Sequence, residues 1–282
     1  MSKREAVVSV IVPTRNSAPT LERCLASIRS QTHSPVELIV VDNQSSDSTP
    51  EIARRYCDIV ETRGPERSSQ RNHGARVAHG RYLLFIDSDM ELSQSVVADC
   101  LKVIRDTNAP AVIVPEISIG DGFLARCRAF ERSFYAGDDS IEGARFFDRL
   151  AFERVGGYDE KLIALEDWDL SARVAAAQRL PRTDSVIAHN EGRLRLTTLL
   201  AKKRYYASSA IHYVRKHGGP AVRQGNIVFR PAFLRNWNRL LRHPVLTLGV
   251  LSIKSLEAGA VAWGIIAGPG KKQDSSGQSI PA

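Results

Sequence analysis

Short β-branched runs, apolar on both faces and separated by helical patterns, limit the folds open to this chain. The runs are VVSVIVPT (7–14), VELIVVD (36–42), DIVET (58–62), YLLFIDSD (82–89) and AVIVPE (111–116). Helical patterns cover residues 20–30, 49–56 and 70–78 between them. Strands that are apolar on both faces are typical of a parallel sheet covered by helices on each side. The sequence therefore predicts an α/β fold with a mostly parallel, Rossmann-like sheet flanked by helices.

Charge is distributed unevenly along the chain. The net charge of the 282 residues is +8, yet residues 193–243 contain 12 Lys and Arg and no acid, and residues 1–192 sum to −5. We expect a main domain at 1–192, a basic helical arm at 193–243, an apolar helix at 244–267 and a disordered tail at 268–282. A basic arm of this kind indicates contact with phosphates, either of nucleic acid or of a membrane surface.

The start of the chain and its cysteines indicate a cytosolic protein. The apolar run near the start, residues 7–12, is too short for a secretory signal. The spacings of the four cysteines fit neither a zinc site nor a redox CxxC pair. We expect these cysteines to be reduced and buried.

Ligands of open α/β sheets bind beyond the carboxyl ends of the strands. Three polar segments lie at such ends, namely PTRN (13–16), DNQSSDS (42–48) and DSD (87–89). If the strand continues through the last segment, Asp87 and Asp89 point the same way with Cα atoms roughly 6.6 Å apart. Such a pair could hold Mg²⁺ or Mn²⁺ together with diphosphate oxygens, or it could only solubilise a strand end.

Other polar side chains have both a binding and a structural interpretation. Asp42 could accept hydrogen bonds from a base or ribose hydroxyl, while Ser46 and Asp47 could simply cap the next helix. Arg71 could pair with diphosphate oxygens or be an ordinary surface arginine. Glu166 and Asp167 crowd a helix start, where the helix dipole alone would favour them. In that helix, Leu170, Val174 and Ala177 are expected to form the buried face.

Four motifs in order resemble a family 2 glycosyltransferase of the GT-A fold, of the bacterial, membrane-associated type. They are SVIVPTRN, VDNQSSDST, RNHGARVAHGRYLLFIDSD and ALEDWDLSAR, and the resemblance covers about residues 7–192. It implies a nucleotide-diphosphate sugar donor of the UDP or GDP type and a divalent cation, Mn²⁺ or Mg²⁺, at the DSD triplet. It also implies transfer of the sugar with inversion.

The resemblance further implies roles for individual residues. Asp89 would be a metal ligand, Asp167 the general base, and Glu166 with Arg173 its supporting groups. His189 could be a further metal or phosphate ligand, or a hydrogen-bonded structural imidazole. The segment GGYDE (156–160) resembles an acceptor-side loop, although a simple left-handed turn would also explain its glycines. The remaining residues implied to bind the nucleotide sugar are Pro13, Thr14, Asn16, Asp42, Arg71, Asn72, Asp87 and Ser88.

Residues 244–267 form an apolar segment long enough to span a bilayer. Placing the charges of Lys254 and Glu257, near its middle, in hydrocarbon is energetically unfavourable. Their spacing places them on one side of a helix. We therefore expect a helix lying in the membrane plane, with a span as the alternative. The basic arm would add attraction to anionic lipid. Together they predict a peripheral enzyme on the cytosolic face of the cell membrane, in polysaccharide or glycolipid synthesis, with a lipid-linked or saccharide acceptor.

Other interpretations remain open from the sequence. The basic arm could instead pack on the acidic body or mediate oligomer contacts. A nucleic-acid-binding protein would explain the basic charge, but the arm lacks a zinc or RNA-recognition signature, so we expect no nucleic-acid partner. A nucleotidyltransferase on a similar fold would also bind nucleotide and metal, and it would release pyrophosphate instead of a nucleoside diphosphate.

Overall fold

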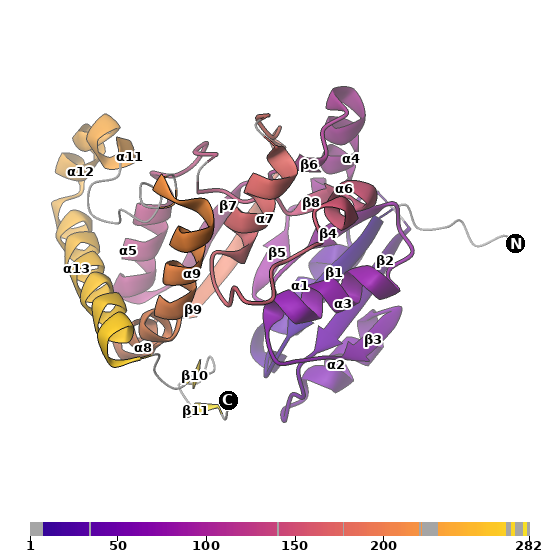
Figure 1. Cartoon of the computed structure of the whole chain (residues 1–282), viewed down its shortest axis with the longest axis horizontal. Helices are drawn as coiled ribbons and strands as arrows, with labels where there is room; N and C mark the ends of the chain where they lie inside the picture. The colour runs from indigo at the N-terminus through magenta and orange to yellow at the C-terminus, as the bar shows by residue number, and fades with distance from the viewer. Residues whose placement is uncertain are drawn as a thin grey trace, which may run out of the picture. The chain divides into compact units, whose positions relative to one another are not determined.

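The chain divides into two compact units in the computed structural model (Figure 1). We call Met1–Glu116 with Glu142–His189 the sheet unit, and Ile117–Ile141 with Asn190–Ala282 the helical unit. The structure describes residues 8–33, 35–139, 141–176, 178–219, 221, 231–268, 272–273 and 279–280.

A six-stranded sheet in the order β3-β2-β1-β4-β8-β6 forms the centre of the sheet unit. Its strands are β1 (Val8–Thr14), β2 (Val36–Asp42), β3 (Ile59–Thr62), β4 (Tyr82–Phe85), β6 (Ala111–Val112) and β8 (Phe146–Asp148). Strand β1 is parallel to β2 and β4, and β2 is parallel to β3, whereas β8 runs antiparallel to β4 and β6. The predicted α/β class with a mostly parallel sheet is confirmed.

Helices cover both faces of this sheet. They are α1 (Ala18–Arg29), α2 (Thr49–Tyr56), α3 (Arg67–Val77), α4 (Val96–Thr107), α6 (Arg149–Arg154) and α7 (Glu166–Ala175). Successive strand residues point to opposite faces, so Val10 of β1 packs in a core with α1, α2 and α4, while Ile11 packs in a second core with α3, α6 and α7. The helix α7 buries Leu170 and Val174 as expected, and Ala177 lies outside the described residues.

The helical unit contains most of the C-terminal third of the chain. Its helices are α5 (Gly122–Arg132), α8 (Leu196–Tyr205), α9 (Ala207–His217), α11 (Pro231–Arg235), α12 (Trp237–Arg242) and α13 (Pro244–Ala267). Strand β7 (Glu116–Asp121) leads into it, and strand β9 (Ile187–Arg193) starts in the sheet unit and ends here. Cys127 of α5, Leu199 of α8, and Val250 and Ile253 of α13 form its main apolar cluster.

The structure differs from the sequence-based expectation in three places of this region. Residues 117–141 group with the helical unit and not with the main domain, because α5 buries its apolar face against α8 and α13. The single helix expected at 196–216 is two helices that meet at Tyr206. Of the expected disordered tail, β10 (Lys272–Gln273) and β11 (Ser279–Ile280) pair as antiparallel strands, and most of the remaining residues lie outside the described ones.

Three of the four cysteines and the apolar helix match their predictions. All four cysteines are free; Cys24, Cys100 and Cys127 are buried, and Cys57 is half-buried. The 24-residue helix α13 has the limits expected from the sequence. Its length and composition would allow it to cross a membrane.

Candidate active site

The DSD triplet lies in a turn and not in a strand. Strand β4 ends at Phe85, and the backbone N–H of Met90 donates a hydrogen bond of 3.0 Å to the carbonyl oxygen of Asp87. Strand alternation therefore does not apply to these residues, and the expectation that Asp87 and Asp89 point the same way is wrong. The two carboxylates contact different partners, so this turn does not position them to bind one cation together.

Asp87 is held by two arginines. Its Oδ1 lies 2.6 Å from Nη2 of Arg71 on α3, and its Oδ2 lies 3.6 Å from Nη2 of Arg145, which directly precedes β8. Burial alone would raise the pKa of Asp87, but the charges of Arg71, Arg145 and Arg67 outweigh it and hold the pKa well below its usual range. Asp87 is therefore an ionised anchor for the two guanidinium groups.

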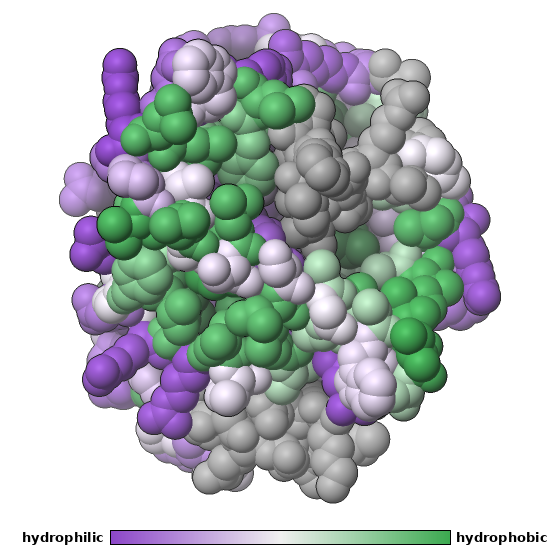
Figure 2. Space-filling model, turned by 90° about the vertical axis from the view of Figure 1, so that its left-hand side faces the viewer, coloured by the Kyte–Doolittle hydropathy of each residue, from purple (hydrophilic) through white to green (hydrophobic). Residues whose placement is uncertain are grey.

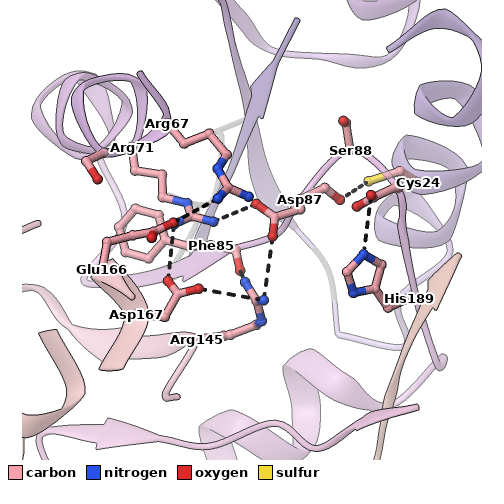
Figure 3. A network of polar contacts seen from close by, with 12 residues as sticks. Cys24, Arg67, Arg71, Phe85, Asp87, Ser88, Arg145, Glu166, Asp167 and His189 are labelled. Atoms are coloured by element: carbon pink, nitrogen blue, oxygen red, sulfur yellow. Dashed lines mark hydrogen bonds and ion pairs between the residues drawn. The ribbon is translucent and has the colours of Figure 1, made fainter. Parts of the chain in front are cut away.

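The same arginines reach the start of α7 (Figure 3). Nη1 of Arg71 lies 3.1 Å from both Glu166 Oε1 and Asp167 Oδ1, and Nη2 of Arg145 lies 3.9 Å from Asp167 Oδ2. Arg71 is fully buried, so it is not a surface arginine. We call Arg71, Arg145, Asp87, Glu166 and Asp167 the arginine–carboxylate network.

Asp167 is the more accessible acid at the start of α7. Its side chain is 26% exposed, whereas that of Glu166 is 4% exposed. Leu165, immediately before the helix, has a φ of 66°, a strained conformation for a bulky residue, which turns the chain into this first turn. Burial, reinforced by Glu166 and Asp87, raises the pKa of Asp167 despite the opposing charges of Arg71 and Arg145.

Asp89 contacts a histidine of strand β9. Its Oδ2 lies 3.3 Å from Nε2 of His189, which β9 places opposite Met90 of strand β5 (Met90–Leu92). The other ring nitrogen, Nδ1, lies 3.7 Å from Glu116 Oε2, and Glu116 Oε1 accepts a 2.5 Å hydrogen bond from Nε of Arg145. His189 is thus ordered by two carboxylates, and Glu116 connects it to the arginine–carboxylate network.

This pair fits a cation that takes further ligands from its substrate. No group of three His, Cys, Asp or Glu able to hold a metal was found among the described residues. However, Mg²⁺ in nucleotide sites is commonly held by one or two carboxylates plus phosphate oxygens and water, and imidazole is an accepted ligand of transition metals. The carboxylate of Asp89 is 41% exposed, so it remains accessible to such an ion.

The ends of β1 and β2 are joined by hydrogen bonds. Thr14 Oγ1 donates to Asp42 Oδ1 at 2.9 Å, and Ser45 donates to the same carboxylate through its backbone N–H and its hydroxyl. Asn16, with a φ of 47°, accepts a 2.9 Å hydrogen bond from the backbone N–H of Ser46. Pro13 is opposite Val41 in the parallel register, directly before this loop. These residues shape one rigid wall at the sheet edge, and Ser88 joins it by donating to Ser17 Oγ at 2.9 Å.

Asn72 contacts a neighbouring loop. Its Nδ2 donates to the carbonyl of Tyr158 at 2.9 Å and to Glu160 Oε1 at 3.0 Å, and its Oδ1 accepts from the backbone N–H of Tyr158 at 2.9 Å. Arg173 of α7 donates to the carbonyl of Gly157, which has a φ of 69°. A Cβ atom on Gly157 would approach Asn72 Oδ1 to 2.7 Å, so this glycine is required both for its φ and for its close contact.

Sequence reasoning missed two members of the site. Arg145 precedes a strand of three residues, which is too short to recognise from a pattern, so nothing in the sequence indicated where its side chain points. Glu116 ends the predicted run 111–116 just as Asp42 ends the run 36–42, so its position after an apolar run is the signal that indicates it.

The sequence matches a known protein family. Residues 9–156 match the profile of glycosyl transferase family 2. The chain is 27% identical over 217 residues to glycosyltransferase GlyA of Streptococcus pneumoniae. The aligned region covers 74% of this chain and 29% of that protein. It is 28% identical over 149 residues to the poly(ribitol-phosphate) beta-N-acetylglucosaminyltransferase TarP of Staphylococcus aureus, covering 50% of this chain and 46% of that one. The matched region thus spans less than half the length of these relatives.

The fold has relatives among solved structures. A mannosyltransferase from Pyrobaculum calidifontis, solved in complex with GDP-Man and Mn²⁺, superposes with a TM-score of 0.68 at 19% identity and covers 93% of this chain and 88% of that one. The central sheet flanked by helices and this neighbour together identify the GT-A fold. On the match over residues 9–156, this chain belongs to glycosyltransferase family 2.

Proposed function

We propose that this protein transfers a sugar, with inversion, from a nucleotide-diphosphate sugar to an acceptor hydroxyl. The observation that carries the proposal is the arrangement at the sheet edge, where Asp89 beside His189 and the partly accessible Asp167 are linked through Arg145 and Glu116. Family membership supports this reaction class, and solved neighbours of the same fold contain GDP-Man or UDP-GlcNAc.

Asp89 and His189 would hold the divalent cation. A bound Mn²⁺ or Mg²⁺ would neutralise charge on the departing diphosphate. Asp89 supplies a hard carboxylate oxygen, and the contact of His189 Nδ1 with Glu116 fixes the ring so that Nε2 points to Asp89. The Mn²⁺ in the mannosyltransferase structure supports the choice of ion.

Asp167 would act as the general base. Inversion in one displacement needs one base opposite the leaving group to take the proton of the attacking hydroxyl. A raised pKa suits that task, because a stronger base accepts a proton more readily near neutral pH. Arg71 and Arg145 orient its carboxylate, and Asp87 and Glu166 orient Arg71.

The wall formed by Pro13, Thr14, Asn16 and Asp42 would face the nucleoside, with Ser88 beside it. For three predicted donor ligands the contacts support a different task. Asn72 directs its hydrogen bonds to residues 158 and 160, so we assign it to positioning the loop 156–160. Arg71 and Asp87 pair with each other, so we assign them to positioning Asp167 instead of contacting the diphosphate.

We further propose a peripheral location on the cytosolic face of the cell membrane, with a lipid-linked or saccharide acceptor in polysaccharide or glycolipid synthesis. The apolar helix α13 and the basic residues before it support the location. One relative, named as a poly(ribitol-phosphate) beta-N-acetylglucosaminyltransferase, supports a polymeric acceptor as one candidate.

Replacement of the proposed metal ligand tests the reaction. Two unit charges about 4 Å apart at an effective dielectric near 20 interact by roughly 4 kcal/mol, and each ~1.4 kcal/mol is about tenfold in rate. Asp89→Ala should therefore lower kcat about a thousandfold with an unchanged unfolding midpoint. Activity above about a tenth of wild type would contradict the assignment.

The product distinguishes the two enzyme classes. Donor binding is first identified by a thermal-shift panel of UDP, GDP and CDP sugars with and without Mn²⁺, since a ligand of the folded state raises its stability. The donor that binds is then incubated with acceptor candidates. Release of nucleoside diphosphate supports sugar transfer. In a parallel incubation with the matching nucleoside triphosphate and a sugar 1-phosphate, release of pyrophosphate would instead establish a nucleotidyltransferase.

A further inference from the structure

Helix α13 buries its own charges. Lys254 and Glu257, in the middle of this apolar helix, are 6% and 0% exposed. Lys254 Nζ lies 2.6 Å from Glu131 of α5 and 2.9 Å from Glu257, and Arg128 of α5 lies 2.8 Å from Glu257. Lys203 of α8 lies 3.8 Å from Glu257. We call these five residues the buried ion cluster.

The buried ion cluster fixes α13 alongside α5 and α8. Burial alone would raise the pKa of Glu257, but the charges of Lys203, Arg128 and Lys254 lower it to about 2, so the group is ionised at neutral pH. Removing α13 from its neighbours would leave an ionised pair without its partners, which is strongly unfavourable in hydrocarbon. A helix fixed in this way along two charged surface helices cannot be surrounded by lipid on all sides.

The opposite side of α13 exposes large apolar side chains. Leu248, Leu251 and Trp263 are 65%, 53% and 57% exposed. The same exposure continues on α11 and α12 at Leu234, Trp237 and Leu241. We call this surface the apolar face, and its large residues are Leu234, Trp237, Leu241, Val245, Leu248, Leu251, Leu256, Trp263, Ile265 and Ile266. Figure 2 shows hydrophobic side chains gathered on this side of the molecule, with hydrophilic ones around the margin.

Charge beside the apolar face selects its partner. Arg235 and Arg242 are exposed on α11 and α12, and residues 193–253 contain no Asp or Glu. A symmetric dimer through this face would bring the exposed Arg235 and Arg242 of both copies into one interface, because each copy contributes the same patch. Anionic headgroups would instead complement the arginines, and tryptophans such as Trp237 and Trp263 favour the membrane–water interface.

We infer that the apolar face rests in the interface of a bilayer containing anionic lipid, with α13 lying in the membrane plane and its charges turned inward to the buried ion cluster. The inference rests on the proposed membrane location and names the surface and the mode of attachment. It requires nothing of the transfer reaction itself.

The test is sedimentation of the full-length protein with vesicles of phosphatidylcholine alone or of equal parts phosphatidylcholine and phosphatidylglycerol. The variant Leu248→Gln/Leu251→Gln keeps good helix formers while removing apolar surface, and should weaken partitioning at least about tenfold. The matched control is Leu150→Gln, since Leu150 is 67% exposed on α6 of the sheet unit. The control should sediment like wild type.

A second variant examines the margin. Arg235→Gln/Arg242→Gln should weaken binding to the anionic vesicles about tenfold and leave binding to phosphatidylcholine vesicles unchanged. Wild-type protein should be released from vesicles by alkaline carbonate, whereas retention after carbonate would establish a spanning helix and overturn the inference. The inference also fails if wild type does not sediment, or if the leucine variant sediments like wild type.

Two further readouts separate the possible causes of failure. Light scattering that shows a wild-type dimer and a monomeric leucine variant, without vesicle binding, would assign the apolar face to a second copy of the chain. Thermal shift by nucleotide with Mn²⁺ is recorded on the same samples. A retained shift without vesicle binding overturns this inference alone, whereas vesicle binding without any shift overturns the proposed reaction alone.

Discussion

At the scale of single residues, one turn separates the tasks of two neighbouring carboxylates. Asp87 pairs with Arg71 and Arg145, whereas Asp89 contacts His189. The sequence indicated that acids at this strand end matter, but strand periodicity could not predict their directions because β4 ends at Phe85. The partners of Asp87 come from elements that are far away in sequence, so only the fold brings them together.

The pH dependence of the reaction should report Asp167. A general base must be deprotonated, and burial with nearby acids raises the pKa of Asp167. The rate kcat should therefore fall as the pH drops. The midpoint of this acid limb of the pH–rate profile should lie above about 3.9, the ordinary pKa of Asp. A pH–rate profile at saturating donor measures it. A limb at or below the ordinary value would argue against Asp167 as the base.

Arg145 should position that base without binding donor. Its charge lowers the pKa of Asp167, so Arg145→Gln should move the acid limb to higher pH and lower kcat about a hundredfold. The affinity for nucleotide should change little. Arg81→Gln removes an exposed arginine, 3.6 Å from Asp148, and is the matched control. Loss of nucleotide affinity with an unshifted limb would assign Arg145 to donor binding instead.

At the scale of elements, the sequence predicted long, strongly patterned segments and missed short ones. The limits of β2, α2 and α13 match the expectation, because each combines a clear apolar pattern with a defined end. Strands β5 and β8 contain three residues each, too few to show a period, yet they position His189 and Arg145. The break at Tyr206 between α8 and α9 is likewise without a Pro or Gly signal.

The buried ion cluster should stabilise the docking of α13. In Glu257→Gln, Glu131 is the only acid left in the buried ion cluster to balance its three cations. Because this leaves buried charges uncompensated, the substitution should lower the free energy of unfolding by about 3 kcal/mol. Urea unfolding followed by tryptophan fluorescence measures the change. Trp237 and Trp263 of the helical unit contribute to this signal together with Trp168 of the sheet unit.

The matched control is Glu153→Gln on α6, whose side chain is 56% exposed and lies 3.8 Å from Arg149. An exposed pair of this kind contributes at most about 1 kcal/mol. Equal effects of the two substitutions would show that the buried ion cluster contributes nothing beyond a surface pair.

At the scale of the whole molecule, charge and pattern predicted an acidic sheet domain followed by a basic helical part. The structure has two such units, but the helical unit also recruits residues 117–141. This exchange could not be read from the sequence, because the apolar residues of α5 give no indication of which neighbours will cover them. The sheet unit contains all residues of the candidate site, so its chemistry can be examined independently of how the helical unit meets a membrane.

The cation site at Asp89 is tested most directly by calorimetric titration of UDP and GDP into wild type and Asp89→Ala, each with and without Mn²⁺. We predict that Mn²⁺ strengthens the binding of one nucleoside diphosphate to wild type at least about tenfold and leaves its binding to the variant unchanged. Equal Mn²⁺ dependence in both proteins, or no nucleotide binding by wild type, would contradict a nucleotide–cation site at Asp89.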